Sequence, residues 1–479
     1  MLFQSFSFVL IFLPLVVLGW HFFSAFRYRG VSEWFMILAG ICFYSFFGVR
    51  DLVLILACTA VGYLLHRAFW RARSGLQTKL FLAGGILLYL AVLLFYKISG
   101  GALPVGLSFY LFQLIIFLIE RARGKFTDIS AREYFFYVLY FPKLAQGPIA
   151  FPEEILDQLQ TRTRGRIDKE ALLRGLILFI LGLAKKVLFA DALAPLVQHG
   201  FEQTLYLDTA TVLLVMISYA FQLYFDFSGY CDMAMGISQM LGIRLPVNFN
   251  SPFQATNQRD FWKRWHMTLT RFFTRYVYIP LGGSRKGVLR TIVNTLLVFL
   301  LSGLWHGLGI TYLVWGAING VFVVVSHFLS KLAGDGGKQP ENPQKGGTFG
   351  RIRTFAAFLF TLVFFRSESV EMAVAMLKRF LIPLYPGFLL RTAEHLNIVE
   401  LYPLTKALSL YLPGTESTVQ LILWILLLIL GFFLVRRKNA YEIAAEMPLK
   451  AVYIAPLALL FAWSMLAFNN VGTFLYFAY

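Results

Sequence analysis

Two histidines, His306 and His266, are the residues of this chain whose type and setting best suit chemistry on a substrate. His306 lies in the apolar stretch LSGLWHGLGI, and no charged residue occurs within ten positions of it on either side. An imidazole there either handles a proton or forms a buried hydrogen bond between helices, and the sequence alone leaves both interpretations open. In the first case the neutral ring accepts the proton of a hydroxyl that attacks a thioester, then returns it to the leaving thiolate.

His266 lies 40 positions earlier, within residues 248–290, where basic residues outnumber acidic ones by eight to one. Aromatic residues recur there near helical spacing, so the stretch predicts one amphipathic helix at the inner membrane surface. Its basic face is either an anchor for lipid headgroups or a docking face for an acidic acyl donor, such as a coenzyme with phosphates. Two histidines connected in this way can face one pore from different depths.

Other polar groups lie inside apolar stretches, where they are costly and are therefore functional candidates. Asp226, Ser228 and Asp232 lie in QLYFDFSGYCDMAMG, whereas Lys185 and Lys186 lie in LGLAKKVLF. For the two lysines a structural role, with ammonium groups that reach an interface or a wet cavity, is favoured over a catalytic one.

Other kinds of chemistry lack their motifs. The sequence has no GxSxG elbow for a serine nucleophile and no GxxxxGK[ST] loop for phosphate. Cys42, Cys58 and Cys231 show neither a CxxC pair nor the spacing of Cys/His metal ligands. We therefore expect no metal, no disulfide framework and no tightly bound cofactor.

The elements that must position these residues are membrane helices. Hydrophobic residues make up 58% of the 479 residues and charged residues only 14%, which excludes an ordinary soluble enzyme. Apolar runs of about 17–25 residues recur along the chain and predict an all-α, polytopic membrane bundle of about twelve spans. The expected spans are residues 7–26, 33–47, 52–65, 80–96, 104–119, 171–196, 211–227, 291–305, 309–329, 354–365, 420–435 and 451–468.

Four basic clusters set the expected orientation, because such residues are enriched in cytoplasmic loops. They extend from Arg67 to Lys79, from Arg121 to Lys125, from Arg162 to Lys169 and from Arg436 to Lys438. With the spans above, all four clusters lie on the inner side and both termini lie outside. The same bias accounts for the net charge of +18, so we expect membrane lipid and no nucleic acid as a partner.

Several segments depart from simple spans. Residues 134–150 hold two prolines and residues 229–246 are interrupted by Asp232 and Gly236, so a broken helix beside a cavity is expected in each. Residues 331–353 predict a flexible inner linker, and residues 371–391 predict an outer segment that lies on the membrane surface. The single membrane domain, 1–479, then divides into N-terminal spans (1–130), a catalytic core with re-entrant and interfacial helices (131–330), the linker (331–353) and C-terminal spans (354–479).

Six stretches carry a shared pattern and are spread, in order, along most of the chain. They are LPVGLSFYLFQ (103–113), YFPKLAQGPI (140–149), YFDFSGYCDMAMGISQMLGI (224–243), NFNSPFQATNQRDFWKRWHMTLTRFFTRYVYIPLGG (248–283), LSGLWHG (301–307) and the terminal FLYFAY (474–479). In combination they resemble the membrane-bound O-acyltransferase family, and within it the bacterial branch of alginate O-acetyltransferases and teichoic acid D-alanyltransferases.

The resemblance implies a helical bundle with a central funnel or tunnel, which an acyl donor enters from the cytoplasm and an acceptor from the far side. It places His306 at the family's catalytic histidine and His266 at a second position that polarises or orients the reactants. It assigns the lining or bracing of the site to Asp226, Ser228, Asp232, Asn250, Arg264, Trp265 and Trp305. Glu120, Thr270 and Thr274-Arg275 depart from the commonest pattern, which puts salt bridges between helices there in doubt.

The resemblance further implies transfer of an acyl group, acetyl in the first place, from acetyl-CoA or an acyl carrier thioester for O-acetylation of an extracellular polysaccharide such as alginate or cellulose. D-alanyl or other acyl transfer to teichoic acid or peptidoglycan is the alternative. A transporter of small solutes and a structural membrane subunit are the hypotheses from other classes. A bacterial inner-membrane location, a periplasmic acetyltransferase subunit and polysaccharide machinery are expected.

Overall fold

The computed structural model describes residues 1–26, 29–72, 74–100, 103–161, 167–332, 347–398, 401–412, 414–470, 472 and 475. Every regular element in this part of the chain is a helix, as the sequence predicts. Eight of these helices are long and apolar enough to cross a membrane. They are α1 with the π-helical turn before it (Ser7–Ser24), α3 (Val49–Arg71), α4 (Gly75–Ile98), α11 (Thr209–Met240), α14 (Val288–His306), α15 (Ile310–Leu332), α16 (Gly347–Arg366) and α20 (Glu416–Val435).

Other apolar helices occupy the remaining predicted spans. They are α2 (Arg29–Ser45), α5 (Leu107–Ala122), α22 (Ile454–Leu466), and α9 (Lys169–Ala184), which continues through the π-helical Lys185–Ala190 into α10 (Asp191–Glu202). Each span expected from the sequence therefore coincides with a helix, and the predicted all-α membrane bundle is confirmed.

Short helices make up the rest of the described chain. They are α6 (Ala131–Leu139), α7 (Phe141–Leu144), α8 (Pro152–Thr161), α12 (Gln258–Arg264), α13 (Met267–Phe273), α17 (Val370–Lys378), α18 (Pro386–Ala393), α19 (Tyr402–Tyr411) and α21 (Ala440–Glu446). The break between α6 and α7 at Tyr140 agrees with the irregular segment expected at 134–150. Helices α17 and α18 lie largely within residues 371–391, and the location of this segment on the outer membrane surface stays a prediction.

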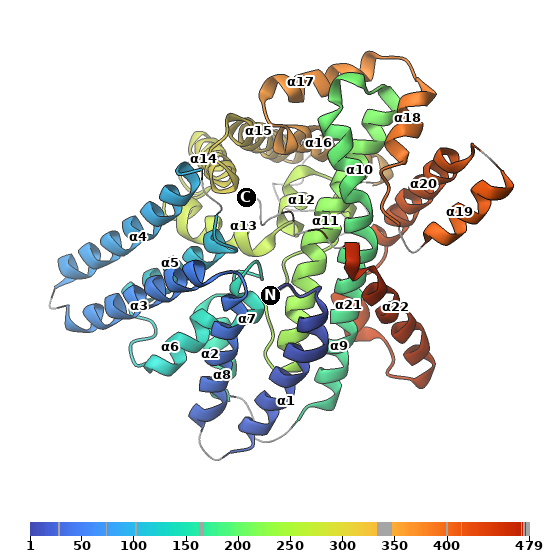
Figure 1. Ribbon diagram of the computed structural model, residues 1–479. Coiled ribbons are helices and arrows are strands. Elements are labelled where there is room, and N and C mark those ends of the chain that lie inside the picture. The colour runs from blue at the N-terminus through green and yellow to red at the C-terminus, as the bar shows by residue number, and fades with distance from the viewer. Residues whose placement is uncertain are drawn as a thin grey trace.

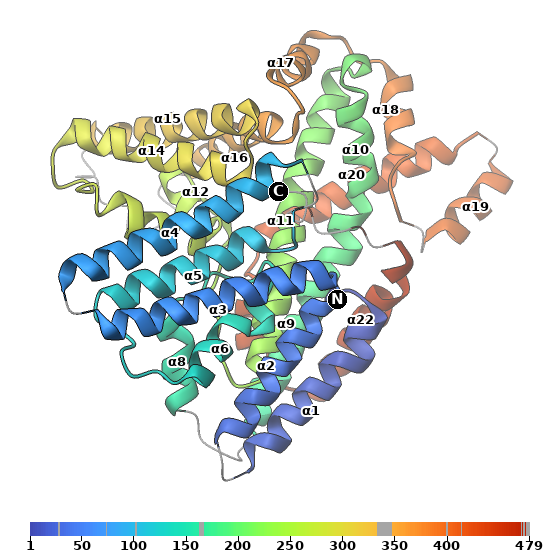
Figure 2. The ribbon, with the colours of Figure 1, turned by 60° about the vertical axis from the view of Figure 1, so that its left-hand side comes forward.

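The helices are grouped around two long rods that run side by side through the middle of the molecule (Figure 1). One rod is α11, and the other is α9 with α10. Helices α3, α4 and α5 form one wall beside these rods, and α14, α15 and α16 form a second wall above it (Figure 2). Helices α19, α20 and α22 lie on the opposite side of the rods from α3 and α4.

Glycines bring the two central rods into close contact. A methyl group on Gly182 of α9 would lie 2.7 Å from the carbonyl oxygen of Gly229 on α11. One further heptad away, a methyl group on Gly175 would lie 2.6 Å from the carbonyl oxygen of Gly236. Small residues at such positions let helix backbones approach closely in a membrane, where packing replaces the hydrophobic effect as the force between helices.

Ion pairs join the same two rods. Lys185 Nζ lies 2.6 Å from Asp232 Oδ2, and Lys186 Nζ lies 2.6 Å from Asp191 Oδ1 and 2.7 Å from Asp226 Oδ1. Lys186 and Asp226 are buried. Because each charge has a partner of opposite sign inside the protein, both lysines have a structural role, but through ion pairs within the bundle and not through ammonium groups that reach an interface or a wet cavity.

The same pairs explain why one expectation is wrong. Helix α11 continues without interruption from Thr209 to Met240, so the break predicted within 229–246 begins only after Met240. The carboxylate of Asp232, which suggested a break, is neutralised by Lys185 of the neighbouring rod, and Gly236, which also suggested it, is a packing contact with Gly175. Irregular backbone follows at residues 241–251, before the short 3-10 turn Pro252–Gln254.

Two other expectations about boundaries need correction. The predicted linker 331–353 is shorter than expected, because α15 ends at Leu332 and α16 begins at Gly347; residues 333–346 lie outside the described part of the chain. The single amphipathic helix predicted in 248–290 is instead divided into α12, α13 and a π-helical segment, Thr274–Tyr278. The division falls at His266, and its cause is described below.

We expect Gly182→Ala to destabilise the bundle, because its methyl group would meet the backbone of α11. Overpacking of this kind costs about 1–3 kcal/mol. Thermal unfolding in detergent measures the effect. The matched control is Gly84→Ala on α4, where the new methyl group has no atom within 4 Å and alanine is the better helix former. Equal melting temperatures for the two variants would contradict the proposed role of the glycine contact.

Candidate active site

A cavity of about 420 Å³ lies between the segment 259–284 and the wall formed by α14, α15 and α16. Both histidines singled out by the sequence, His266 and His306, line it. Most of the side chains that line the cavity are apolar or aromatic, and a minority are polar. A cavity of this kind is the usual form of a small-molecule site.

His306 is the last residue of α14. The helix ends there because Gly307 takes an extended conformation, with φ −169°. The buried imidazole packs edge-on against three rings, with centroid distances of 4.7 Å to Trp305, 5.3 Å to Trp315 and 5.0 Å to Phe365. These rings come from three successive helices, so the wall α14–α15–α16 sets the orientation of the imidazole at the cavity surface.

His266 lies at a sharp turn between α12 and α13. Its φ of 46° places it in the left-handed region, which non-glycine residues rarely adopt. The turn is held by backbone hydrogen bonds from Asn250 N to Arg264 O and from Met267 N to Asn248 O, each 2.9 Å long. These bonds replace helical ones, and they are the reason that 248–290 does not form one helix.

The side chain of Asn248 fixes the ring of His266. Asn248 Oδ1 accepts hydrogen bonds from the backbone N and from Oγ1 of Thr268, and it lies 3.2 Å from His266 Nδ1. Because this oxygen only accepts, Nδ1 carries the hydrogen and Nε2 carries the lone pair of the neutral ring. The imidazole of His266 thus presents its basic nitrogen away from Asn248.

Trp305 lies between the two histidines. Its ring centroid is 6.0 Å from that of His266 and 4.7 Å from that of His306. Phe109 of α5 adds a further ring to these three. Its ring centroid lies 5.9 Å from that of His266, on which it stacks, and 5.1 Å from that of Trp305. A layer of buried aromatic rings therefore holds both imidazoles in one site.

The two ends of the cavity differ in polarity. Lys263, Thr274 and Ser284, which line one end, are exposed, so the cavity opens there. Arg259 lines the same cavity and adds positive charge. This opening lies next to the start of α14, whereas His306 is at the other end of that helix, so an entering molecule passes from a basic mouth to an apolar interior.

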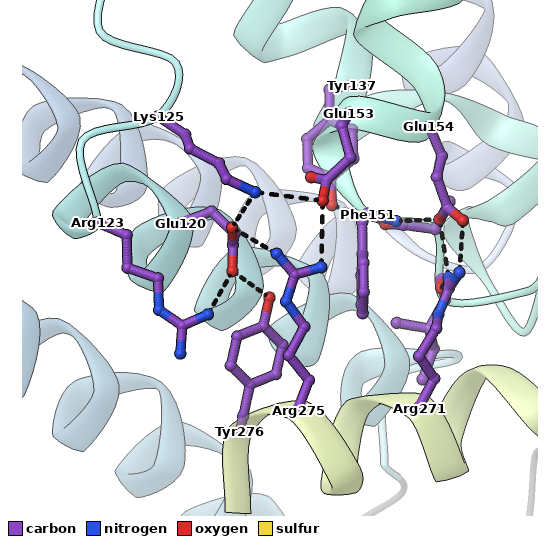
Figure 3. A network of polar contacts seen from close by, with 12 residues as sticks. Glu120, Arg123, Lys125, Tyr137, Phe151, Glu153, Glu154, Arg271, Arg275 and Tyr276 are labelled. Atoms are coloured by element: carbon purple, nitrogen blue, oxygen red, sulfur yellow. Dashed lines mark hydrogen bonds and ion pairs between the residues drawn. The ribbon is translucent and has the colours of Figure 1, made fainter. Parts of the chain in front are cut away.

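A network of ion pairs fixes the segment that carries His266 (Figure 3). The buried carboxylate of Glu120, on α5, contacts Arg275 at 2.7 Å, Lys125 at 2.9 Å and the hydroxyl of Tyr276 at 2.8 Å. Arg275 also reaches Glu153 of α8 at 3.1 Å. The doubt about salt bridges at Glu120 and Arg275 is therefore resolved: the two residues pair directly.

A second arginine extends this network. Arg271 Nη2 donates to Glu154 Oε2 at 2.8 Å and to the carbonyl of Ile149 at 3.1 Å. Its guanidinium also lies over the ring of Phe151, 4.1 Å from the centroid. Together, Arg271 and Arg275 attach α13 and the π-helical segment after it to the rest of the bundle, and the basic face is in part occupied by protein carboxylates.

The other predicted site residues divide into three groups. Trp265 lines the cavity, and Trp305 packs between the two histidines. Asn250 and Arg264 brace the turn, since Arg264 Nη1 donates to the Asn250 carbonyl at 3.3 Å and Arg264 Nε to Asp260 at 2.9 Å. Asp226, Ser228 and Asp232 are buried on α11 and do not line the cavity. The two aspartates brace the bundle through their lysine pairs.

Several cavity residues were not singled out from the sequence. Trp315, Phe365 and His327 line the cavity, yet each lies in a stretch whose composition is that of an ordinary membrane helix. Asn248 also escaped notice, although an asparagine within an apolar run is the signal that could have drawn attention to it. Within the described residues, no three His, Cys, Asp or Glu side chains are grouped so that they could hold a metal ion.

Comparisons with known proteins agree with this architecture. The model of MBOAT, the membrane-bound O-acyltransferase family, matches residues 41–335. The peptidoglycan O-acetyltransferase of Helicobacter pylori is 31% identical over 422 residues, which cover 79% of each chain. A probable alginate O-acetylase of Pseudomonas aeruginosa is 33% identical over 404 residues, 78% of this chain and 73% of the relative. The teichoic acid D-alanyltransferase of Bacillus subtilis is 28% identical over 236 residues, 47% of this chain and 60% of the relative.

A polytopic helical bundle with His266 and His306 in one cavity is suited to acyl transfer within a membrane. The extent of the family match and of the two longer alignments shows the family directly. The chain belongs to the membrane-bound O-acyltransferase family and is an acyltransferase, as the resemblance implied.

We expect Asn248→Ala to lower the rate of acyl transfer at least ten-fold, because His266 loses the group that sets its tautomer and orientation. A ten-fold loss corresponds to about 1.4 kcal/mol of transition-state stabilisation. The rate per folded molecule is the measurement, and Asn397→Ala, outside the cavity, is the matched control. A variant with the parent rate would show that His266 needs no support from Asn248.

The Glu120 network predicts a dependence of stability on pH. Burial alone would raise the pKa of Glu120, but hydrogen bonds from Lys125 and Tyr276 and the charges of Arg275 and Lys125 hold it below its ordinary value. A lowered pKa in the folded state means that the stabilisation is complete above the ordinary value and is lost as pH falls through the folded-state value.

Melting temperatures between pH 7 and pH 3 test this prediction. Glu120→Gln is expected to melt lower than the parent at pH 7 and to show a weaker decline on acidification. Glu170→Gln is the control, because Glu170 forms an exposed i,i+4 pair with Arg174 and such pairs contribute little. Parallel declines for the parent and Glu120→Gln would refute the assignment.

Proposed function

We propose that this O-acyltransferase transfers an acetyl group from a cytoplasmic thioester to a hydroxyl group on the outer side of the membrane, for O-acetylation of an extracellular polysaccharide. The observation that carries the proposal is the position of His306. It lies at the end of a membrane-crossing helix, inside a cavity whose open mouth is basic and is at the other end of that helix.

The donor enters through the mouth. Arg259 and Lys263 suit the phosphates of acetyl-CoA or of a phosphopantetheine carrier, because ammonium and guanidinium groups are strong donors to phosphate oxygens. The narrow apolar interior suits the pantetheine arm and the thioester. The orientation expected from the basic loops supports a mouth that faces the cytoplasm, and the proposed membrane is a bacterial inner membrane. No tightly bound cofactor takes part.

The reaction needs one group that acts first as a general base and then as a general acid. The acceptor hydroxyl oxygen attacks the thioester carbonyl carbon while His306 takes the hydroxyl proton. A carbon–oxygen bond forms, the carbon–sulfur bond breaks, and the proton returns from His306 to the thiolate. His266, whose basic nitrogen faces away from Asn248, orients or polarises the reactants beside it.

The polymer is proposed from the relatives. Two of them carry names of acetyl transfer, to peptidoglycan in one case and to alginate in the other, and both align over more than three quarters of this chain. A periplasmic acetyltransferase subunit and polysaccharide machinery complete the system. The second candidate is D-alanyl transfer to teichoic acid, which is supported by the shorter alignment with the D-alanyltransferase.

His306→Ala is expected to lower O-acetylation of the extracellular glycan by about 10²–10⁴-fold, the usual contribution of a general base. Mass spectrometry of glycan from cells that produce equal amounts of each protein in the membrane is the measurement. His395→Gln is the control, because His395 is exposed and lies outside the cavity. Undiminished acetylation by His306→Ala would overturn the proposal, and transport of unchanged acetyl-CoA without ester formation would identify a transporter.

A further inference from the structure

A lysine on a distant helix contacts the backbone of His306. Lys97 lies in the last turn of α4, and its Nζ donates a hydrogen bond of 3.1 Å to the carbonyl oxygen of His306. The two residues are 209 positions apart in the chain. Figures 1 and 2 both show this end of α4 beside α14. The rest of α4 is largely exposed on the surface of the bundle.

The hydrogen bond meets a need of α14. The last four carbonyl groups of a helix have no partner within the helix, and an unpaired carbonyl in apolar surroundings costs free energy. At the end of α14, Gly307 N bonds to the carbonyl of Gly303, and Lys97 takes the carbonyl of His306. A cation at this position also interacts favourably with the negative end of the helix dipole.

The backbone beyond His306 does little to hold it in place. Gly307 and Gly309 follow within three positions, before α15 begins at Ile310. Glycine gives a chain more conformational freedom than any other residue. The aromatic neighbours of His306 orient the plane of its ring, whereas the Lys97 contact fixes the backbone from which the ring projects.

We propose that Lys97 is a positioning residue for acyl transfer: its ammonium group holds the carboxyl end of α14, and thereby His306, at the reacting distance. This inference rests on the proposed function of His306. Lys97 lies at the end of α14 opposite the basic mouth, so it acts on the chemical step and leaves binding of the donor unchanged.

The first test compares steady-state kinetics with acetyl-CoA as the probe. Lys97→Met keeps the length of the side chain without its charge, and we expect kcat to fall at least ten-fold while KM for acetyl-CoA stays within two-fold of the parent. Lys97→Arg, which can still donate to the carbonyl, is expected to recover most of the rate. Lys79→Met is the matched control, because Lys79 is an exposed lysine at the other end of the same helix.

A second variant covers the case in which Lys97→Met folds poorly. Lys97→Cys is purified in the folded state and treated with 2-bromoethylamine, which rebuilds an ammonium group of nearly the original length. Recovery of kcat after alkylation, with no gain when the parent protein is treated alike, supports positioning by the charge. A purely structural role in folding would give no such recovery in molecules that are already folded.

The outcomes separate the two proposals. If His306→Ala is inactive while Lys97→Met has the parent kcat, the role of Lys97 is refuted and the function of His306 stands. If Lys97→Met raises KM with kcat unchanged, Lys97 binds the donor and the inference is also refuted. If His306→Ala retains full activity, the proposed function itself is lost.

Discussion

The contact between α9 and α11 is the interaction on which the positions of the other helices depend. Glycine on both helices lets their backbones approach, and the lysines that follow Gly182 reach aspartates on α11 across the same interface. Glycine contacts alone give little resistance to sliding or rotation of one helix against the other. Ion pairs between defined residues of the two helices do resist such movement. The two features together fix the register of the central rods in surroundings that offer no water to unpaired charges.

From this fixed centre, the cavity is built by short irregular elements. Residues 241–251 leave the end of α11, and Asn248 pairs with the turn at His266. The network around Glu120 attaches the following π-helical segment to α5 and α8. A strained left-handed residue persists only where its surroundings determine it, and here backbone pairing, an asparagine and several ion pairs all act on residues 264–276. The left-handed conformation of His266 is thus a consequence of its supports.

Sequence reasoning predicted the helices well, because a membrane imposes a simple rule on long apolar segments. It also identified two of the three histidines that line the cavity, His266 and His306, whereas His327 was missed. The predictions from the sequence were wrong where a polar residue has its ion-pair or hydrogen-bond partner far away in the chain. Asp232 suggested a broken helix because Lys185, 47 positions earlier, could not be assigned to it from the sequence. The turn at His266 was missed for the same reason, because it depends on pairing with Asn248.

The position of His306 at a helix end has a chemical reason in the proposed mechanism. In the middle of α14, the ring could be approached only sideways, through neighbouring helices. At the last residue, the helix guides one reactant along its length from the basic mouth, while only Gly307, Leu308 and Gly309 lie between the ring and the start of α15. A terminal residue, however, loses the hydrogen bonds that make a helix rigid. A catalytic group at a helix end therefore gains access from two sides and requires an external partner for its carbonyl, and α4 supplies that partner from outside the wall of the cavity.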